Sequence, residues 1–155
     1  MLKKTLHLKF SIELKTDIQT LYDFHTDTDN LPKITPPWLA VKIISLEKPL
    51  IKGSQVELDI GRFGMTQRWK IKIVALNPPE LVCDRALKSS FSSFVHYHRF
   101  KTINEYKSLL CDELELTLPF YPFSLIALPF IKKDIQKMFD YRHLQTKKIL
   151  EKNYV

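Results

Sequence analysis

The N-terminal part of the chain alternates strictly between apolar and polar residues. From residue 5 to residue 14, every even position is apolar and every odd position is polar. Because successive side chains of a strand point to opposite faces, this pattern predicts a first β-strand with one buried face. Thr16 or Asp17 can cap a following helix, whose apolar residues recur at helical spacing over residues 18–22. A second short helical turn is expected before Pro36, the first of two consecutive prolines.

From about residue 38 the pattern changes to short strands. Apolar stretches of period two are separated by turn-forming sequences such as Lys48-Pro49, Phe63-Gly64 and Asn77-Pro78. Strands joined by short turns pair antiparallel, so this region predicts a meander. The inner face of residues 80–87 stays open, because one register buries Leu81, Cys83, Arg85 and Leu87 and the other buries Asp84. The expected strands are residues 39–43, 56–60, 67–73, 80–87, 94–100 and 106–116.

One strand carries an unusual set of side chains. Phe94, His96, His98 and Phe100 share one face, and Val95, Tyr97, Arg99 and Lys101 share the other. Two imidazoles between two phenylalanines on an inner face indicate an apolar cavity with a small polar patch in its wall. The alternative is that both histidines are hydrogen-bonded core residues.

The last segment, residues 124–152, predicts one long amphipathic helix. Its apolar residues follow three- and four-residue steps, and its lysines point away from them. A helix of about 25 residues is about 37 Å long, enough to cross a sheet. The order of elements predicts an α+β fold of one domain over residues 1–155. In this fold a curved antiparallel sheet of about seven strands wraps the C-terminal helix, and two short helices follow the first strand.

Charge and composition exclude several classes of function. The net charge is +7, but the lysines are dispersed and no nucleic-acid motif accompanies them, so we predict no nucleic-acid partner. The three glycines form no phosphate-binding loop, and we predict no cofactor. Cys83 and Cys111 lack metal-ligand spacing, and the N-terminus lacks the apolar block of a signal peptide, so we expect a cytoplasmic protein. The apolar stretch 118–131 is too short and too rich in proline to span a bilayer.

Several short motifs together resemble one family. The sequence is similar to the bacterial ligand-binding group of the SRPBCC superfamily, also called START-like or birch-pollen-allergen-like helix-grip proteins, which is related to polyketide cyclases and dehydrases. The resemblance covers nearly the whole chain. The residues that carry it are Pro36-Pro37, Arg68-Trp69, Asp84, the stretch from Phe94 through His96 and His98 to Phe100, Asp112, Leu118-Pro119 and Phe139-x-Tyr141-Arg142.

This resemblance implies binding of a small hydrophobic or lipid-like molecule between the sheet and the final helix. Apolar side chains would form the wall, and a few polar side chains would orient the polar end of the ligand. The competing interpretation is a core filled by the same aromatic residues. The expected ligand-binding residues are Trp69, Phe94, His96, His98, Phe100, Asp112, Leu114, Phe139 and Arg142.

Three other roles follow from the same residues. As an enzyme, the protein would be a cyclase, dehydratase or hydrolase of an apolar substrate. His96 or His98 would be the base, Asp112 or Asp84 would orient the ring, and Arg142 would stabilise negative charge. A His-x-His pair can also bind Zn²⁺, but no third ligand is set by spacing, so we predict no metal. The stretch 118–123, followed by Lys132-Lys133, either touches an anionic membrane transiently or closes the pocket. The oligomeric state stays open.

Overall fold

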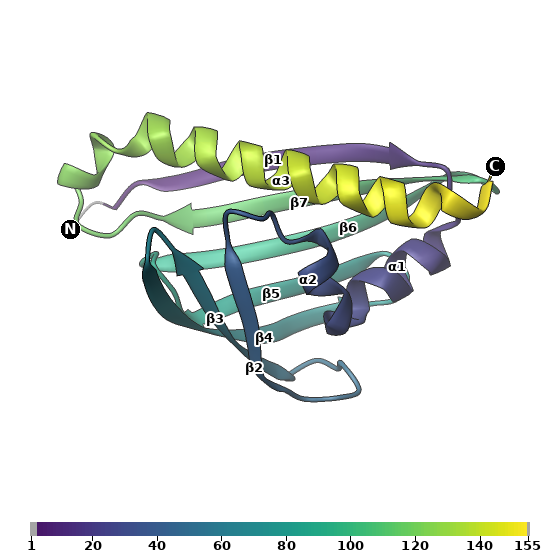
Figure 1. The fold of residues 1–155 in the computed structure, drawn as a ribbon, viewed down its shortest axis with the longest axis horizontal. Helices are drawn as coiled ribbons and strands as arrows, with labels where there is room; N and C mark the ends of the chain where they lie inside the picture. Colours follow the sequence, from purple (N-terminus) through teal and green to yellow (C-terminus); the bar gives the residue numbers. More distant parts are fainter. Residues whose placement is uncertain (1–2, 155) are drawn as a thin grey trace.

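A seven-stranded antiparallel sheet forms the body of the protein, in the strand order β1-β7-β6-β5-β4-β3-β2 (Figure 1). The computed structural model describes residues 3–154. It confirms the predicted α+β helix-grip fold, with two short helices after the first strand and a long one near the C-terminus. The elements are β1 (Thr5–Leu14), α1 (Ile18–Thr26), η1 (Thr28–Asn30), α2 (Leu31–Ile34), β2 (Ala40–Leu46), β3 (Gln55–Arg62), β4 (Met65–Asn77), β5 (Leu81–Lys88), β6 (Ser93–Asn104), β7 (Lys107–Thr117), η2 (Phe123–Leu125), α3 (Leu128–Leu150) and η3 (Glu151–Tyr154).

The first strand and the first helix form where the local sequence predicts them. Leu6, Phe10 and Leu14 of β1 are buried, and the polar side chains between them are exposed. Asp17 is the cap of α1, because its Oδ1 accepts a hydrogen bond of 2.9 Å from the backbone N–H of Thr20. The Thr20 hydroxyl also donates to this carboxylate, and these bonds lower the pKa of Asp17.

The turn between β3 and β4 consists of Phe63 and Gly64, both with positive φ. Two consecutive residues of this kind give the tight hairpin turn whose twist matches that of the flanking strands. The positive φ is energetically unfavourable at Phe63, because only glycine adopts this conformation freely. Its side chain is 79% exposed, so packing of the ring does not hold the turn in place.

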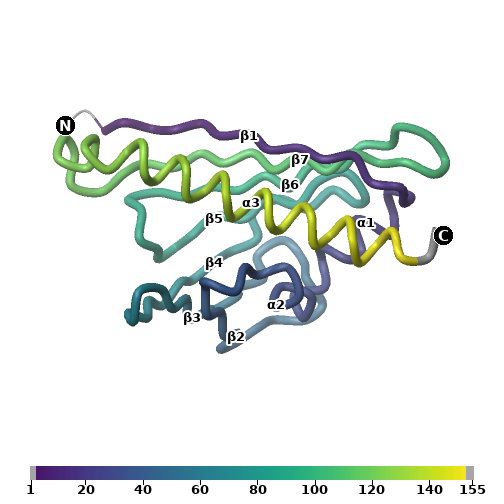
Figure 2. Tube along the Cα trace, turned by 45° about the horizontal axis from the view of Figure 1, so that its top comes forward, coloured from purple at the N-terminus to yellow at the C-terminus, as the bar shows by residue number. Residues whose placement is uncertain are grey.

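The long helix packs along one edge of the sheet. Figures 1 and 2 show α3 running beside β1 and β7, whereas β2 and β3 lie at the far edge of the sheet. The rings of Phe10 and Phe139 stack with centroids 4.8 Å apart. Because α3 covers only part of the curved sheet, the strands β3–β5 face an interior that the helix does not fill. The buried core between α3 and the sheet is formed by Leu6, Phe10, Leu114, Leu116, Leu118, Ile135 and Phe139.

Two features go beyond the sequence prediction. The inner face of β5 carries Val82 and Asp84, which settles the register that the sequence left open. The helix begins at Leu128 rather than near residue 124, because η2 and Pro129 in its first turn define the start. No helix in residues 3–154 has the length and hydropathy needed to cross a membrane.

Candidate functional site

A cavity of about 850 Å³ lies between the inner face of the sheet and the helices α2 and α3. Aromatic and aliphatic side chains form most of its wall. Trp69 and Phe94 meet edge to face with ring centroids 5.3 Å apart, and Phe91 stacks on Phe94 at 5.7 Å. A cavity of this size with a mainly apolar wall is typical of small-molecule sites.

Asp112 of β7 anchors a polar cluster behind this wall. Its Oδ1 accepts a hydrogen bond of 2.7 Å from His96 Nε2, and its Oδ2 accepts one of 2.5 Å from His143 Nε2. His98 Nδ1 approaches the same Oδ1 at 3.2 Å, but its N–H is poorly aligned for a hydrogen bond. Burial alone would raise the pKa of Asp112, but the bonds from His143 and His96 outweigh it and hold the pKa well below its usual value.

The strand register brings these groups together. His98 pairs with Asp112 across β6 and β7, and Asp84 pairs with His96 across β5 and β6. All four residues face the interior because they occupy alternate positions of adjacent strands. His98 Nε2 can therefore also donate to Asp84 Oδ2, at 2.8 Å.

His98 lies between two carboxylates and is positively charged. Burial disfavours the charged ring, but the contacts with Asp112 and Asp84 outweigh it and raise the pKa of His98 to about 9. In the same way, burial alone would raise the pKa of Asp84, but the hydrogen bond from His98 lowers it. The two carboxylates and the imidazolium form one ionised unit at neutral pH.

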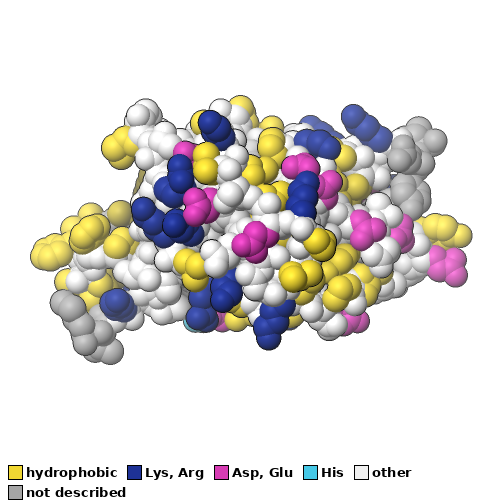
Figure 3. Space-filling model, turned by 90° about the horizontal axis from the view of Figure 1, so that it is seen from below, with side chains coloured by type: hydrophobic (Ala, Val, Ile, Leu, Met, Phe, Trp, Pro, Cys, Tyr) yellow, Lys and Arg dark blue, Asp and Glu magenta, His cyan; other side chains and the backbone are white. Residues whose placement is uncertain are grey.

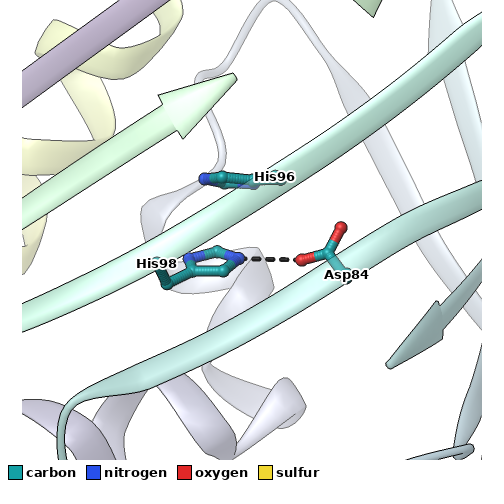
Figure 4. A group of neighbouring side chains, drawn as sticks. All are labelled: Asp84, His96 and His98. Carbon is teal, nitrogen blue, oxygen red and sulfur yellow. Dashed lines mark hydrogen bonds and ion pairs between the residues drawn. The ribbon is translucent and has the colours of Figure 1, made fainter. Parts of the chain in front are cut away.

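His96 is neutral beside this charge. Figure 4 shows its ring beside that of His98, and the two rings are tilted by 31° with their centroids 3.7 Å apart. Burial and the charge of His98 both lower the pKa of His96. Because the Asp112 carboxylate only accepts, the proton of the neutral ring is on Nε2, and Nδ1 keeps a free lone pair.

Arg142 of α3 is the charged group that the cluster leaves unpaired. Its side chain is half-buried and lines the cavity, and its guanidinium carbon lies 5.4 Å from the centre of the Phe139 ring. Burial lowers its pKa, and the charges of Asp112 and Asp84 act against that shift. No hydrogen bond or ion pair joins its guanidinium to any residue between positions 3 and 152.

Two histidines of the site, His143 and His25, were not predicted from the sequence. His143 is buried and bonded to Asp112, and its signal was its position four residues after Phe139 on the buried face of the helix. His25 of α1 lines the cavity with its ring centroid 6.2 Å from that of His98. Its Nδ1 donates to the Leu21 carbonyl at 3.0 Å, and burial lowers its pKa to about 4.

The structure brings most of the predicted site residues to one cavity. Asp112 lies behind the imidazoles rather than at the surface of the cavity, and Phe100 is buried in a separate core cluster with Tyr22. Neither residue is part of the wall, whereas Phe91 belongs to it. The predicted residues that line the cavity are Trp69, Phe94, His96, His98, Leu114, Phe139 and Arg142.

The group Asp84, His96 and His98 has the residue types of a metal site. Its candidate ligand atoms all lie within 4.8 Å of one another. Two of these atoms already bond one another, because the protonated His98 Nε2 donates to Asp84 Oδ2 at 2.8 Å. A metal would have to displace that proton and break the bond.

Together, the curved sheet, the gripped helix and the cavity between them define a START-like ligand-binding fold. The chain belongs to the family described as "Polyketide cyclase / dehydrase and lipid transport", whose sequence model matches residues 14–140, and hence to the SRPBCC superfamily. No curated protein matches the chain significantly.

Solved structures of low sequence identity share the fold. The Zhui aromatase/cyclase from a Streptomyces species has a TM-score of 0.78 at 13% identity, with 98% of this chain and 97% of that chain covered. A START superfamily protein from Mycobacterium smegmatis has a TM-score of 0.71 at 14% identity, covering 94% and 97%. The di-domain aromatase/cyclase StfQ of steffimycin biosynthesis has a TM-score of 0.78 at 12% identity, with 97% of this chain covered. This chain spans about half of StfQ, namely 52%.

Proposed function

We propose that the protein binds a small hydrophobic or lipid-like molecule, with the apolar part against the aromatic wall and the polar part near Arg142 and the imidazoles. The observation that carries the proposal is the cavity of about 850 Å³, which is apolar over most of its wall and has a few charged residues, Arg142 among them. Burial of apolar ligand surface contributes roughly 25 cal/mol per Å², so a medium-sized molecule binds there without catalytic machinery.

Native mass spectrometry of protein purified without detergent tests this proposal. We expect co-purified small molecules, or binding of added lipid extract that also raises the melting temperature, because a ligand that binds only the folded state stabilises it. A protein that never gains mass and whose melting temperature no apolar compound changes would contradict the proposal.

Catalysis on an apolar substrate is the second candidate function. It is favoured by the neutral His96, whose free Nδ1 can accept a proton while Asp112 orients the ring through a bond of 2.7 Å. Arg142 can stabilise negative charge that develops on the substrate. In a screen of cyclase, dehydratase and hydrolase substrates, His96→Ala should abolish any turnover and leave ligand binding partly intact. If this variant loses only stability, His96 is structural.

The mouth of the cavity supports transient contact with a membrane. Phe120 is 84% exposed, Phe123 is 77% exposed and Ile126 is 87% exposed, so these three side chains do not pack over the pocket, whereas Leu118 and Pro119 line it. Phe63 and Phe130 are also exposed, and both line the cavity. Figure 3 shows hydrophobic side chains protruding from one end of the molecule. The exposed Lys132 and Lys133 follow in α3 and favour an anionic surface.

Co-sedimentation with phosphatidylglycerol vesicles tests this contact. We expect binding at low salt that weakens at high salt, because the charge interaction is screened. Phe123→Ser should reduce it further, and sedimentation that equals a vesicle-free control at low salt would exclude the contact.

We also propose that the protein is cytoplasmic. Cys83 and Cys111 are both buried free thiols, and such thiols persist in a reducing compartment.

A further inference from the structure

The cavity wall contains two arginines with different partners. Arg62 at the end of β3 binds Asp134 of α3 through both terminal nitrogens. Arg142 has no such partner between positions 3 and 152, although Asp84 and Asp112 are near enough to affect its charge. One guanidinium therefore holds the sheet to the helix, and the other presents its donors to the cavity.

The neighbouring carboxylates form hydrogen bonds with imidazoles, and neither forms an ion pair with Arg142. His96 and His143 bond the two oxygens of Asp112, and His98 bonds Asp84. A guanidinium has five N–H donors and accepts no hydrogen bond. A half-buried guanidinium without a protein acceptor is costly unless water or a ligand satisfies it.

The shape of the free group selects its partner. A guanidinium is planar, and its parallel N–H groups match the two oxygens of a carboxylate, which gives a bidentate, charge-assisted pair. An alcohol or an amine offers no such match. Resting on the proposed binding function, we infer that the ligand is an amphiphilic acid whose carboxylate is bound by Arg142 and whose apolar part fills the aromatic cavity.

The position of Arg142 along α3 also sets the direction of the ligand. Phe130 lies in the first turn of α3, is 61% exposed and lines the cavity, and Arg142 follows twelve residues later. At 1.5 Å per residue this separation is about 18 Å along the helix axis. With its carboxylate at Arg142, the ligand would extend its apolar chain past Met138 and Ile135 toward Phe130.

A matched pair of probes tests the inference. Decanoate and decanol have the same chain and differ only in the polar end, and their affinities can be measured by isothermal titration calorimetry at neutral pH. We expect the unmodified protein to bind decanoate at least tenfold more tightly than decanol. Arg142→Gln should lose this preference, because its affinity for decanoate should fall at least tenfold more than its affinity for decanol. Arg142→Lys keeps the positive charge but not the planar guanidinium with its parallel N–H groups, so it should retain only part of the preference.

Arg68→Gln is the control for general charge. It removes one positive charge from β4, but Arg68 is paired with Asp59 and Glu57 and does not line the cavity, so the preference for decanoate should be unchanged. Equal affinity for acid and alcohol in the unmodified protein would overturn the inference, as would a preference that survives in Arg142→Gln. Both outcomes leave the proposed binding function intact, whereas failure to bind either probe would contradict both.

Discussion

At the scale of single residues, the charge of the site depends on which of the imidazoles around Asp112 are protonated. Asp112 holds His96 and His143, and His98 is shared between Asp112 and Asp84. Two imidazoles whose centroids lie 3.7 Å apart do not both carry charge at low cost, so His98 is charged and His96 is neutral. This asymmetry gives the cavity one fixed cation in its wall and one free lone pair.

The charge on His98 makes stability depend on pH in a defined window. Its pKa is about 9 in the folded protein and about 6.5 when unfolded. The stabilisation is therefore complete below pH 6.5 and is lost as the pH rises through 9. We expect the free energy of unfolding in urea to fall by about 3 kcal/mol over this range.

His98→Gln should remove most of that dependence on pH. His7→Gln is the matched control, because His7 is 70% exposed on the outer face of β1, and it should keep the slope of the unmodified protein. The low pKa values of His25 and His96 act below pH 6.5 and do not contribute in this window. An unchanged slope in His98→Gln would show that His98 is not charged.

At the scale of elements, α3 has two faces with separate roles. Ile135, Phe139, His143 and Thr146 are buried and follow steps of four, four and three residues. Phe139 packs on Phe10 of β1 and contacts the cavity as well. The helix is thus held to β1 and β7 at one edge, and its other flank faces the cavity.

Truncating two phenylalanines of this helix compares the stability contributed by a buried ring with that contributed by an exposed one. Phe139→Ala should lower the free energy of unfolding by about 3–5 kcal/mol, because Phe139 is 1% exposed and its loss leaves a void against Phe10. Phe130→Ala should change it by only about 0.5 kcal/mol or less, because that ring is largely exposed. Chemical denaturation measures both values, and similar losses in the two variants would contradict the packing described for α3.

At the scale of the whole molecule, the cavity exists because a curved seven-stranded sheet is wider than one helix. The edge formed by β1 and β7 is closed by α3, and β3 to β5 keep apolar side chains that face space. A side chain that fills this space should therefore cost little stability and block the ligand.

Leu58→Trp tests this view of the cavity. Leu58 is buried on β3 and lines the cavity, so the larger ring should weaken binding of decanol more than tenfold while the circular dichroism spectrum is retained. Ile44→Trp is the control, because Ile44 is partly exposed on β2 and lies outside the cavity wall. If both variants bind decanol as the unmodified protein does, the ligand occupies another place.

Local patterns in the sequence were enough to predict the elements and the fold class. The alternation in β1, the inward face of Phe94, His96 and His98, and the long C-terminal helix depend on side-chain periodicity, which each segment carries by itself. The resemblance to the SRPBCC superfamily added the prediction of a few residues that line the cavity, from Trp69 on β4 to Arg142 on α3, but not of the rest of its wall.

Only the tertiary structure decided which polar groups pair. The register of β5 placed Asp84 opposite His96 and within hydrogen-bond distance of His98. The docking of α3 brought His143 to Asp112, while the guanidinium of Arg142 kept its donors free. These outcomes depend on contacts between residues far apart in the chain, such as the pair His143 and Asp112 at a separation of 31 residues. Periodicity tells which face a side chain is on, but the charge state and partner of a buried group are set by neighbours that only the folded chain supplies.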